Sequence, residues 1–264
     1  MILTVWLLAC LGAEPSRTVA SPPPASESAV TEPLVLSIRS LADASAATAA
    51  LMHLVHGDGP LRPVEVVLHG ELSGLHLSLG GELDPRRVQL RVRGEGAVLR
   101  QALIELTGES VQIEGLRFVG SQRGLVLQAA TRLELNQVQV RELPVSSSAG
   151  AGSRALGGIR LRALAPGVQA SLRDLLLLDN SASPLLRWEA SPGASFARVD
   201  LVDCRLGGNV APELLTGPVG IVEARGCQRA GEGSWLQAES ATTLLLEEPV
   251  SVGPEVLERW RAGG

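Results

Sequence analysis

A six-residue pattern that recurs along the chain constrains the fold more than any other feature. Each copy has an apolar residue, two residues that are mostly polar or small, an apolar residue, a variable residue and a further apolar residue. The four clear copies begin at Ile113, Leu135, Leu172 and Leu201, and a weaker copy lies at residues 224–227. Such self-similarity at intervals of about 20 residues or more is the signature of a repeat architecture.

A second type of short apolar segment lies between these copies, in GLVLQA, GGIRLRA, PLLRWEA and SWLQA. A unit of roughly 22 residues with three short strands is typical of a parallel β-helix. The third position of the pattern then lies at a corner between two strands, and this explains a glycine inside a good strand sequence. The corner residues are Gly115, Gln137, Asp174, Asp203 and Gly226, and we expect left-handed or turn geometry there.

The segments VEVVLHGEL, VQLRVRGEGAVLRQ and ALIELTGESVQIEGLRFVGS resemble the opening coils of the right-handed parallel β-helix, or pectin-lyase-like, superfamily. The resemblance covers residues 64–247 and implies an all-β solenoid of about 7–8 coils. It does not imply one activity, because the superfamily includes lyases, hydrolases, esterases and non-enzymatic adhesins.

We expect helices to cover both ends of this solenoid, because the end coils would otherwise expose apolar layers. Residues 43–56 predict an N-terminal capping helix, with Asp43 as N-cap and Gly57 as the stop signal. Residues 254–261 predict a short C-terminal capping helix that begins with Pro254. Residues 34–264 therefore form one predicted β-helix domain.

The segment before this domain predicts an envelope address. Residues 1–10 form an apolar run that ends in Leu7-Leu8-Ala9-Cys10, which resembles the signal of a bacterial lipoprotein with lipidation at Cys10. Residues 11–33 are rich in Pro, Ser and Ala and indicate a tether. We therefore expect an outer-membrane or cell-surface lipoprotein of a bacterium, held to the membrane by lipid. A plain secretory signal is the alternative.

Composition argues against some functions. The net charge is −5 and the charged residues are scattered, which does not fit a nucleic-acid surface. The motifs that mark the polygalacturonase, pectate lyase and pectin methylesterase types of this superfamily do not occur in the sequence. The chain contains no Lys, so a lyase base would have to be Arg or His.

Stacking of coils about 4.8 Å apart brings equivalent residues together and defines one candidate catalytic pair. Asp174 and Asp203 would lie one above the other, and paired carboxylates serve in acid–base catalysis or hold Ca²⁺. The alternative is that Asp is simply suited to a turn. Asn180 and Asn209 each lie six residues further on, where they could stack as an asparagine ladder.

A candidate binding stripe consists of Arg160, Arg162 and Arg187, which we expect on the outer face of the third strand of each coil. Such a stripe suits an acidic glycan, although a solvated face is the simpler interpretation. Trp188 and Trp235 are expected to pack inward. The four histidines, at positions 53, 56, 69 and 76, match no familiar metal-binding spacing, so we predict no metal and no cofactor, with Ca²⁺ implied only by the enzyme hypothesis.

Cys204 and Cys227 follow equivalent corners and should be buried neighbours one coil apart. Such a stack permits a disulfide or two inert thiols, and both remain open.

The leading hypothesis is an envelope-anchored, non-catalytic β-helix protein that presents a rigid face to a glycan or to an envelope protein. The rival is a polysaccharide lyase or glycoside hydrolase that uses Asp174 and Asp203. A groove with a convergent acid and base above these aspartates would favour the enzyme.

Overall fold

The computed structural model describes residues 32–56, 63–80, 88–120, 124–143, 158–181, 184–210, 213–232, 234–238 and 242–263, with side chains in the first range to residue 49. The chain divides into Met1–Thr31 and Glu32–Gly264, and only the second unit is described. The predicted signal, Cys10 and the tether to residue 31 lie outside the described residues. Among those that are described, no helix is long and apolar enough to cross a membrane.

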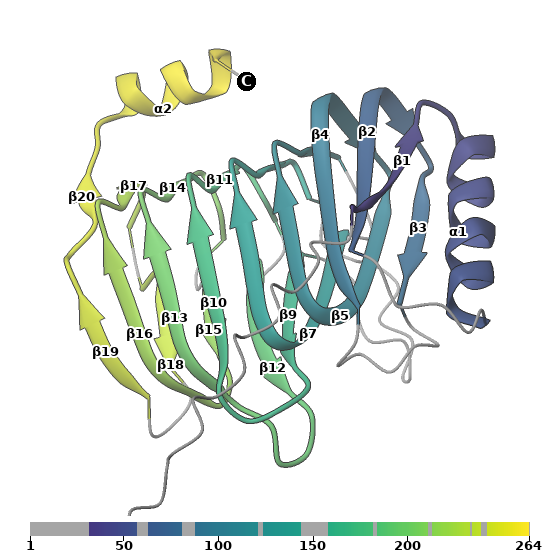
Figure 1. Ribbon diagram of the computed structural model, residues 1–264. Coiled ribbons are helices and arrows are strands. Elements are labelled where there is room, and N and C mark those ends of the chain that lie inside the picture. The colour runs from purple at the N-terminus through teal and green to yellow at the C-terminus, as the bar shows by residue number, and fades with distance from the viewer. Residues whose placement is uncertain are drawn as a thin grey trace, which may run out of the picture. The chain divides into compact units, whose positions relative to one another are not determined.

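Unit Glu32–Gly264 is built from β-strands with one α-helix near each of its ends (Figure 1). The elements in chain order are β1 (Leu34–Ile38), α1 (Leu41–His56), β2 (Val64–Ser73), β3 (His76–Leu79), β4 (Gln89–Arg100), β5 (Leu103–Glu114), β6 (Arg117–Val119), β7 (Gly124–Asn136), β8 (Gln139–Arg141), β9 (Ile159–Ala163), β10 (Val168–Arg173), β11 (Leu176–Leu178), β12 (Leu186–Ala190), β13 (Phe196–Val202), β14 (Arg205–Gly207), β15 (Leu214–Thr216), β16 (Val219–Arg225), β17 (Gln228–Ala230), β18 (Leu236–Ala238), β19 (Thr243–Leu246), β20 (Val250–Ser251) and α2 (Pro254–Ala262).

The strands pair in parallel and form three ladders, in which each strand pairs with the equivalent strand of the next repeat. Ladder 1 contains β1, the first part of β2 and of β4, the second part of β5 and of β7, and then β10, β13, β16 and β19. Ladder 2 contains the second part of β2 and of β4, and then β6, β8, β11, β14, β17 and β20. Ladder 3 contains β3, the first part of β5 and of β7, and then β9, β12, β15 and β18. The prediction of an all-β fold with a long parallel sheet is confirmed, and the three ladders are compatible with a β-helix solenoid.

Alternation along the strands separates a buried side from an outer side. In β9, for example, Ile159, Leu161 and Ala163 are buried and the two arginines between them are half-buried. The core is aliphatic and continuous, and its largest fully buried side chains are Trp188, Phe118 and Phe196. Trp235 is also buried, so both tryptophans pack inward as predicted.

Two rows of corner residues connect the ladders. The first corner, between ladders 1 and 2, is formed by Gly70, Gly96, Gly115, Gln137, Asp174, Asp203 and Gly226, all with φ between 53° and 68°. This confirms the left-handed geometry expected from Gly115 onward. The second corner, between ladders 2 and 3, is formed by Gly74, Gln101, Gly120, Glu142, Asp179 and Gly208, with φ between 49° and 74°. The repeat pattern alone did not reveal the second corner.

Helix α1 begins at Leu41, two residues before the predicted start. Asp43 is therefore not the N-cap: the Asp43 backbone N–H donates to Oγ of Ser40, and the Asp43 carboxylate accepts the N–H of Arg39 at 2.9 Å. The latter bond lowers the pKa of Asp43. Ala44 and Ala47 are buried, and α1 contacts β1 and β3 at the start of the sheet. The expected stop signal at Gly57 lies outside the described residues.

Helix α2 forms where a short C-terminal helix was expected, and Val256, Leu257 and Trp260 are half-buried on one side of it. It lies beside β17, β14 and β11, along the outer face of ladder 2 (Figure 1). A β-carbon placed on Gly207 in β14 would lie 2.6 Å from Cδ1 of Leu257. In β19, Leu244 and Leu245 are 41% and 51% exposed, so this strand keeps an open apolar surface.

Candidate ligand-binding groove

A groove with a volume of about 450 Å³ follows the first corner. Its lining comes from β6, β8, β11 and β14 of ladder 2, from the corner residues before the first three of these strands, and from two residues of β4. It consists of Gly96, Ala97, Gly115, Arg117, Gln137, Gln139, Asp174, Leu176 and Arg205. Four strands at about 4.8 Å spacing give a track of about 14 Å between Arg117 and Arg205. The groove is therefore long enough for an extended ligand that follows the stacking direction.

Two of the corner residues that line the groove, Gly96 and Gly115, have no side chain. Gly96 and Gly115 both have φ of 68°, and the next repeats place Gln137 and Asp174 at the same corner. A β-carbon on Gly96 would meet nothing within 4 Å, whereas one on Gly115 would lie 2.9 Å from the Gly94 carbonyl oxygen. The open space beside Gly96 is thus at one end of the groove, and larger polar side chains bound the other end.

One charged side chain of the groove, Arg117, has no ion-pair partner among the described residues, whereas the other two pair with each other. Asp174 Oδ1 accepts a hydrogen bond from Arg205 Nη2 at 2.7 Å, and both side chains are 41% exposed. Arg117 is exposed and forms no ion pair or side-chain hydrogen bond with any residue that the structure describes. Oε1 of Gln139 is buried without a hydrogen-bond partner. The groove therefore offers one uncompensated positive charge, that of Arg117.

The two candidate carboxylates lie at stacked positions, but only Asp174 lines the groove. Asp174 and Asp203 occupy the same corner in successive repeats, because Arg173 pairs with Val202 and Leu176 with Arg205. Asp203 does not line the groove. Its Oδ1 lies over the next corner residue, only 2.3 Å from where a β-carbon of Gly226 would be.

The three arginines of the predicted binding stripe lie on the outer side of ladder 3. Register places Arg160 beside Arg187, and Arg162 beside Glu189. Glu189 interrupts the positive stripe, since its Oε1 is 3.6 Å from Nε of Arg187. Nε of Arg162 is buried without a hydrogen-bond partner. These residues are adjacent, as expected, but the groove lies on ladder 2.

The described histidines are paired with carboxylates. His69 Nδ1 lies 3.3 Å from Glu95 and His76 Nε2 lies 3.3 Å from Glu105. The side chains of His53 and His56 lie outside the described residues. Within the described ranges, no three His, Cys, Asp or Glu side chains come together as metal ligands would.

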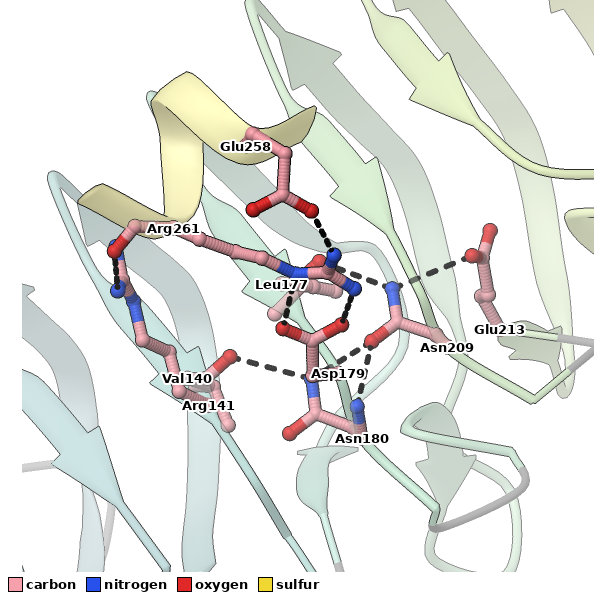
Figure 2. Close-up of polar contacts among 9 residues, drawn as sticks. All are labelled: Val140, Arg141, Leu177, Asp179, Asn180, Asn209, Glu213, Glu258 and Arg261. Atoms are coloured by element: carbon pink, nitrogen blue, oxygen red, sulfur yellow. Dashed lines mark hydrogen bonds and ion pairs between the residues drawn. The ribbon is translucent and has the colours of Figure 1, made fainter. Parts of the chain in front are cut away.

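The expected asparagine ladder is present inside the second corner (Figure 2). Asn209 Oδ1 accepts from Asn180 Nδ2 at 2.8 Å and from the Asn180 backbone N–H at 3.1 Å. Asn180 Nδ2 also donates to the Val140 carbonyl, and Asn209 Nδ2 donates to the Leu177 carbonyl at 2.9 Å. The two side-chain amides therefore satisfy backbone groups of β8, of β11 and of Asn180, which indicates that their role is structural.

The ladder continues into a buried ion pair that the apolar pattern does not predict. Asn209 Nδ2 donates to Glu213 Oε1 at 3.2 Å, and Glu213 Oε2 lies 3.2 Å from Nε of Arg229. The two charged side chains are only 2% and 11% exposed. Burial raises the pKa of Glu213, and Arg229 opposes this effect. The alignment of the repeats could have predicted this burial, because Arg229 pairs with the buried Leu206 and therefore occupies an inward position.

Cys204 and Cys227 are buried neighbours, as the repeat alignment predicted. Gln228 N–H donates to the Cys204 carbonyl at 2.8 Å, so the two corners are in register, and each residue is 2% exposed. Both are free thiols here. Contact with Cys227, followed by burial, raises the pKa of the Cys204 thiol.

Comparison of the chain with protein-family models, with curated proteins and with solved structures finds no match. The resemblance to the pectin-lyase-like superfamily therefore rests on the strand and corner sequences described above.

Proposed function

We propose that this protein is a non-catalytic binding module of the right-handed parallel β-helix type, with about 7–8 coils and helical ends. Its groove along the first corner takes an extended acidic ligand, either a glycan or an acidic segment of an envelope protein. The supporting observation is the chemistry of the groove, in which Arg117 has no partner among the described residues while Asp174 is paired with Arg205.

Binding accounts for this lining better than catalysis does. A glycosidase or lyase needs an acid and a base that converge on one bond. Asp174 is the one carboxylate among the residues that line the groove, and its Oδ1 is held by Arg205 at 2.7 Å. Arginine and amide side chains, by contrast, suit recognition of carboxylate or sulfate groups and hydroxyls. A lyase or hydrolase that uses Asp174 and Asp203 remains the second candidate, because Asp174 does line the groove.

The groove can be filled without damage to the fold. Asn tolerates left-handed geometry, and a β-carbon on Gly96 meets nothing within 4 Å. Gly96→Asn is therefore expected to weaken binding of acidic oligosaccharides or acidic peptides by about tenfold, through loss of space. Gly70→Asn is the matched control, because Gly70 has φ of 65°, equal free space and no place in the groove. Titration calorimetry measures both.

Equal affinities of the two variants would exclude the groove as the binding site. Production of unsaturated or reducing sugar ends by the wild type, lost in Asp174→Asn with the fold intact, would establish the enzyme instead.

We further propose that lipidation at Cys10 holds the protein to the envelope membrane and that residues 11–33 serve as its tether. The Cys10→Ala protein should leave the membrane fraction, because the cysteine thiol is the attachment atom. Fractionation followed by immunoblotting measures this. An unchanged membrane share would show that the protein is held in another way, and a smaller cleaved form would indicate the plain secretory signal.

A further inference from the structure

A second, smaller hollow on ladder 2 gathers three arginines. It has a volume of about 250 Å³, and its lining consists of Val98, Arg100, Arg117, Phe118, Val119, Gln139, Arg141 and Glu142. Register explains the clustering, because Val119 pairs with Arg100 on one side and with Arg141 on the other. Arg117 lies two residues before Val119 on the same outer face of β6. Three guanidinium groups therefore surround Val119.

The three arginines have different partners. Arg100 Nε lies 2.6 Å from Glu71 Oε1, which compensates its charge. Arg141 is held by the last turn of α2, since Nη2 donates to the Trp260 carbonyl at 2.8 Å and Nη1 donates to the Arg261 carbonyl at 3.0 Å. Figure 2 shows the contact between Arg141 and Arg261. Arg117 has no polar partner among the described residues, so its whole guanidinium is available.

Helix α2 itself is fixed firmly enough to orient Arg141. Arg261 donates two hydrogen bonds to Asp179 at the second corner, from Nε to Oδ2 at 2.9 Å and from Nη2 to Oδ1 at 2.5 Å (Figure 2). Such a bidentate pair fixes geometry as well as charge. The carbonyls of the helix end then fix the terminal nitrogens of Arg141, and its Nε remains buried without a partner.

The hollow thus has the unmatched charge that an anion would satisfy. Desolvation and the nearby charge of Arg117 both lower the pKa of Arg141, although Asp179 and Glu142 oppose this. Glu142 lines the hollow and reduces its positive potential. Arg117, Arg141 and Arg100 bring positive charge from three strands, which suits the charge and the several oxygens of a tetrahedral group better than a carboxylate.

We propose that this hollow is a binding site for a tetrahedral oxyanion, a phosphate or sulfate group, held by Arg117 beside the positive charge of Arg141. The site goes beyond the groove function and does not depend on it, although Arg117 and Gln139 line both. Inorganic phosphate and inorganic sulfate are the probes, because each tests one source of the group. A preference for phosphate assigns a phosphomonoester or free phosphate, and a preference for sulfate assigns a sulfate ester.

Calorimetric titration of each anion, at ionic strength held constant with chloride, tests the site. The wild type should bind at least one of the two saturably. Arg117→Gln should weaken that binding about tenfold or more, because it removes charge-assisted hydrogen bonds. Arg225→Gln is the matched control, since Arg225 is exposed, lines neither hollow and loses the same charge. Glu142→Gln should tighten binding about two- to fivefold.

Two further measurements separate this site from the groove. Gly96→Asn fills the groove and should leave anion binding unchanged. The Nε–H resonance of Arg141 should shift on titration in NMR spectra, whereas a diffuse ion cloud would not move it specifically. The site would be disproved by absence of saturable binding of both anions, by equal effects of Arg117→Gln and Arg225→Gln, or by an unmoved Arg141 resonance.

Discussion

Asn209→Ala is expected to lower the free energy of unfolding by about 3–5 kcal/mol, a large effect for one polar side chain. The substitution removes the acceptor for Asn180 and the donor for the Leu177 carbonyl and Glu213. Each buried group left without a partner costs about 1–3 kcal/mol. Equilibrium unfolding in urea, followed by circular dichroism, measures the loss.

Asn136→Ala provides the control, because Asn136 is the half-buried last residue of β7 and its side chain forms no hydrogen bond with a described residue. It should change stability by no more than about 0.5 kcal/mol. Asn209→Asp keeps the shape but replaces the donor with an oxygen that faces Glu213, so it should also be strongly destabilising. If Asn209→Ala and Asn136→Ala proved equally mild, the ladder would contribute little to stability.

Gly124→Ala should be destabilising by about 3 kcal/mol or more, because two unfavourable effects combine. Gly124 has φ of 91°, and a β-carbon there would lie 2.2 Å from the carbonyl oxygen of Gly158 in the next repeat. The obstructing atom belongs to the backbone, so ladder 3 would have to separate locally. Differential scanning calorimetry of the variant and the wild type measures the loss.

Gly167→Ala isolates the conformational part of this penalty. Gly167 has φ of 83° and open space around its α-carbon, so its substitution should cost only about 1–2 kcal/mol. A loss at Gly124 no larger than that at Gly167 would show that the ladders tolerate a side chain between them.

The sequence predicted those parts of the fold that depend on one repeat and its immediate copy. The corner at Gly115, Asp174 and Asp203 was found because each copy places a turn-tolerant residue at the same step of the apolar pattern. The asparagine ladder followed from the same alignment. The second corner was missed, because strands of three residues, such as β8 and β11, are too short to show a period.

The groove could not be read from the sequence, because it depends on a contrast between repeats. The open space lies beside Gly96, whereas Gln137 and Asp174 line the groove from later repeats. Likewise, the hydrogen bonds that hold the Arg141 guanidinium come from carbonyls of α2, a segment more than a hundred residues further along the chain. Apolar periodicity carries no information about such outer-face contacts.

The corner carboxylates make the repeats directional and non-interchangeable. Asp203 Oδ1 occupies the space over Gly226, and Asp179 Oδ1 occupies the space over Gly208, only 2.1 Å from where a β-carbon would be. A side chain at either glycine would displace the carboxylate before it, and this costs more at Asp179, because Arg261 holds both oxygens of that carboxylate. A designer who deletes, duplicates or reorders repeats of this chain should therefore transfer Asp179 and Gly208 together, as a single two-repeat cassette.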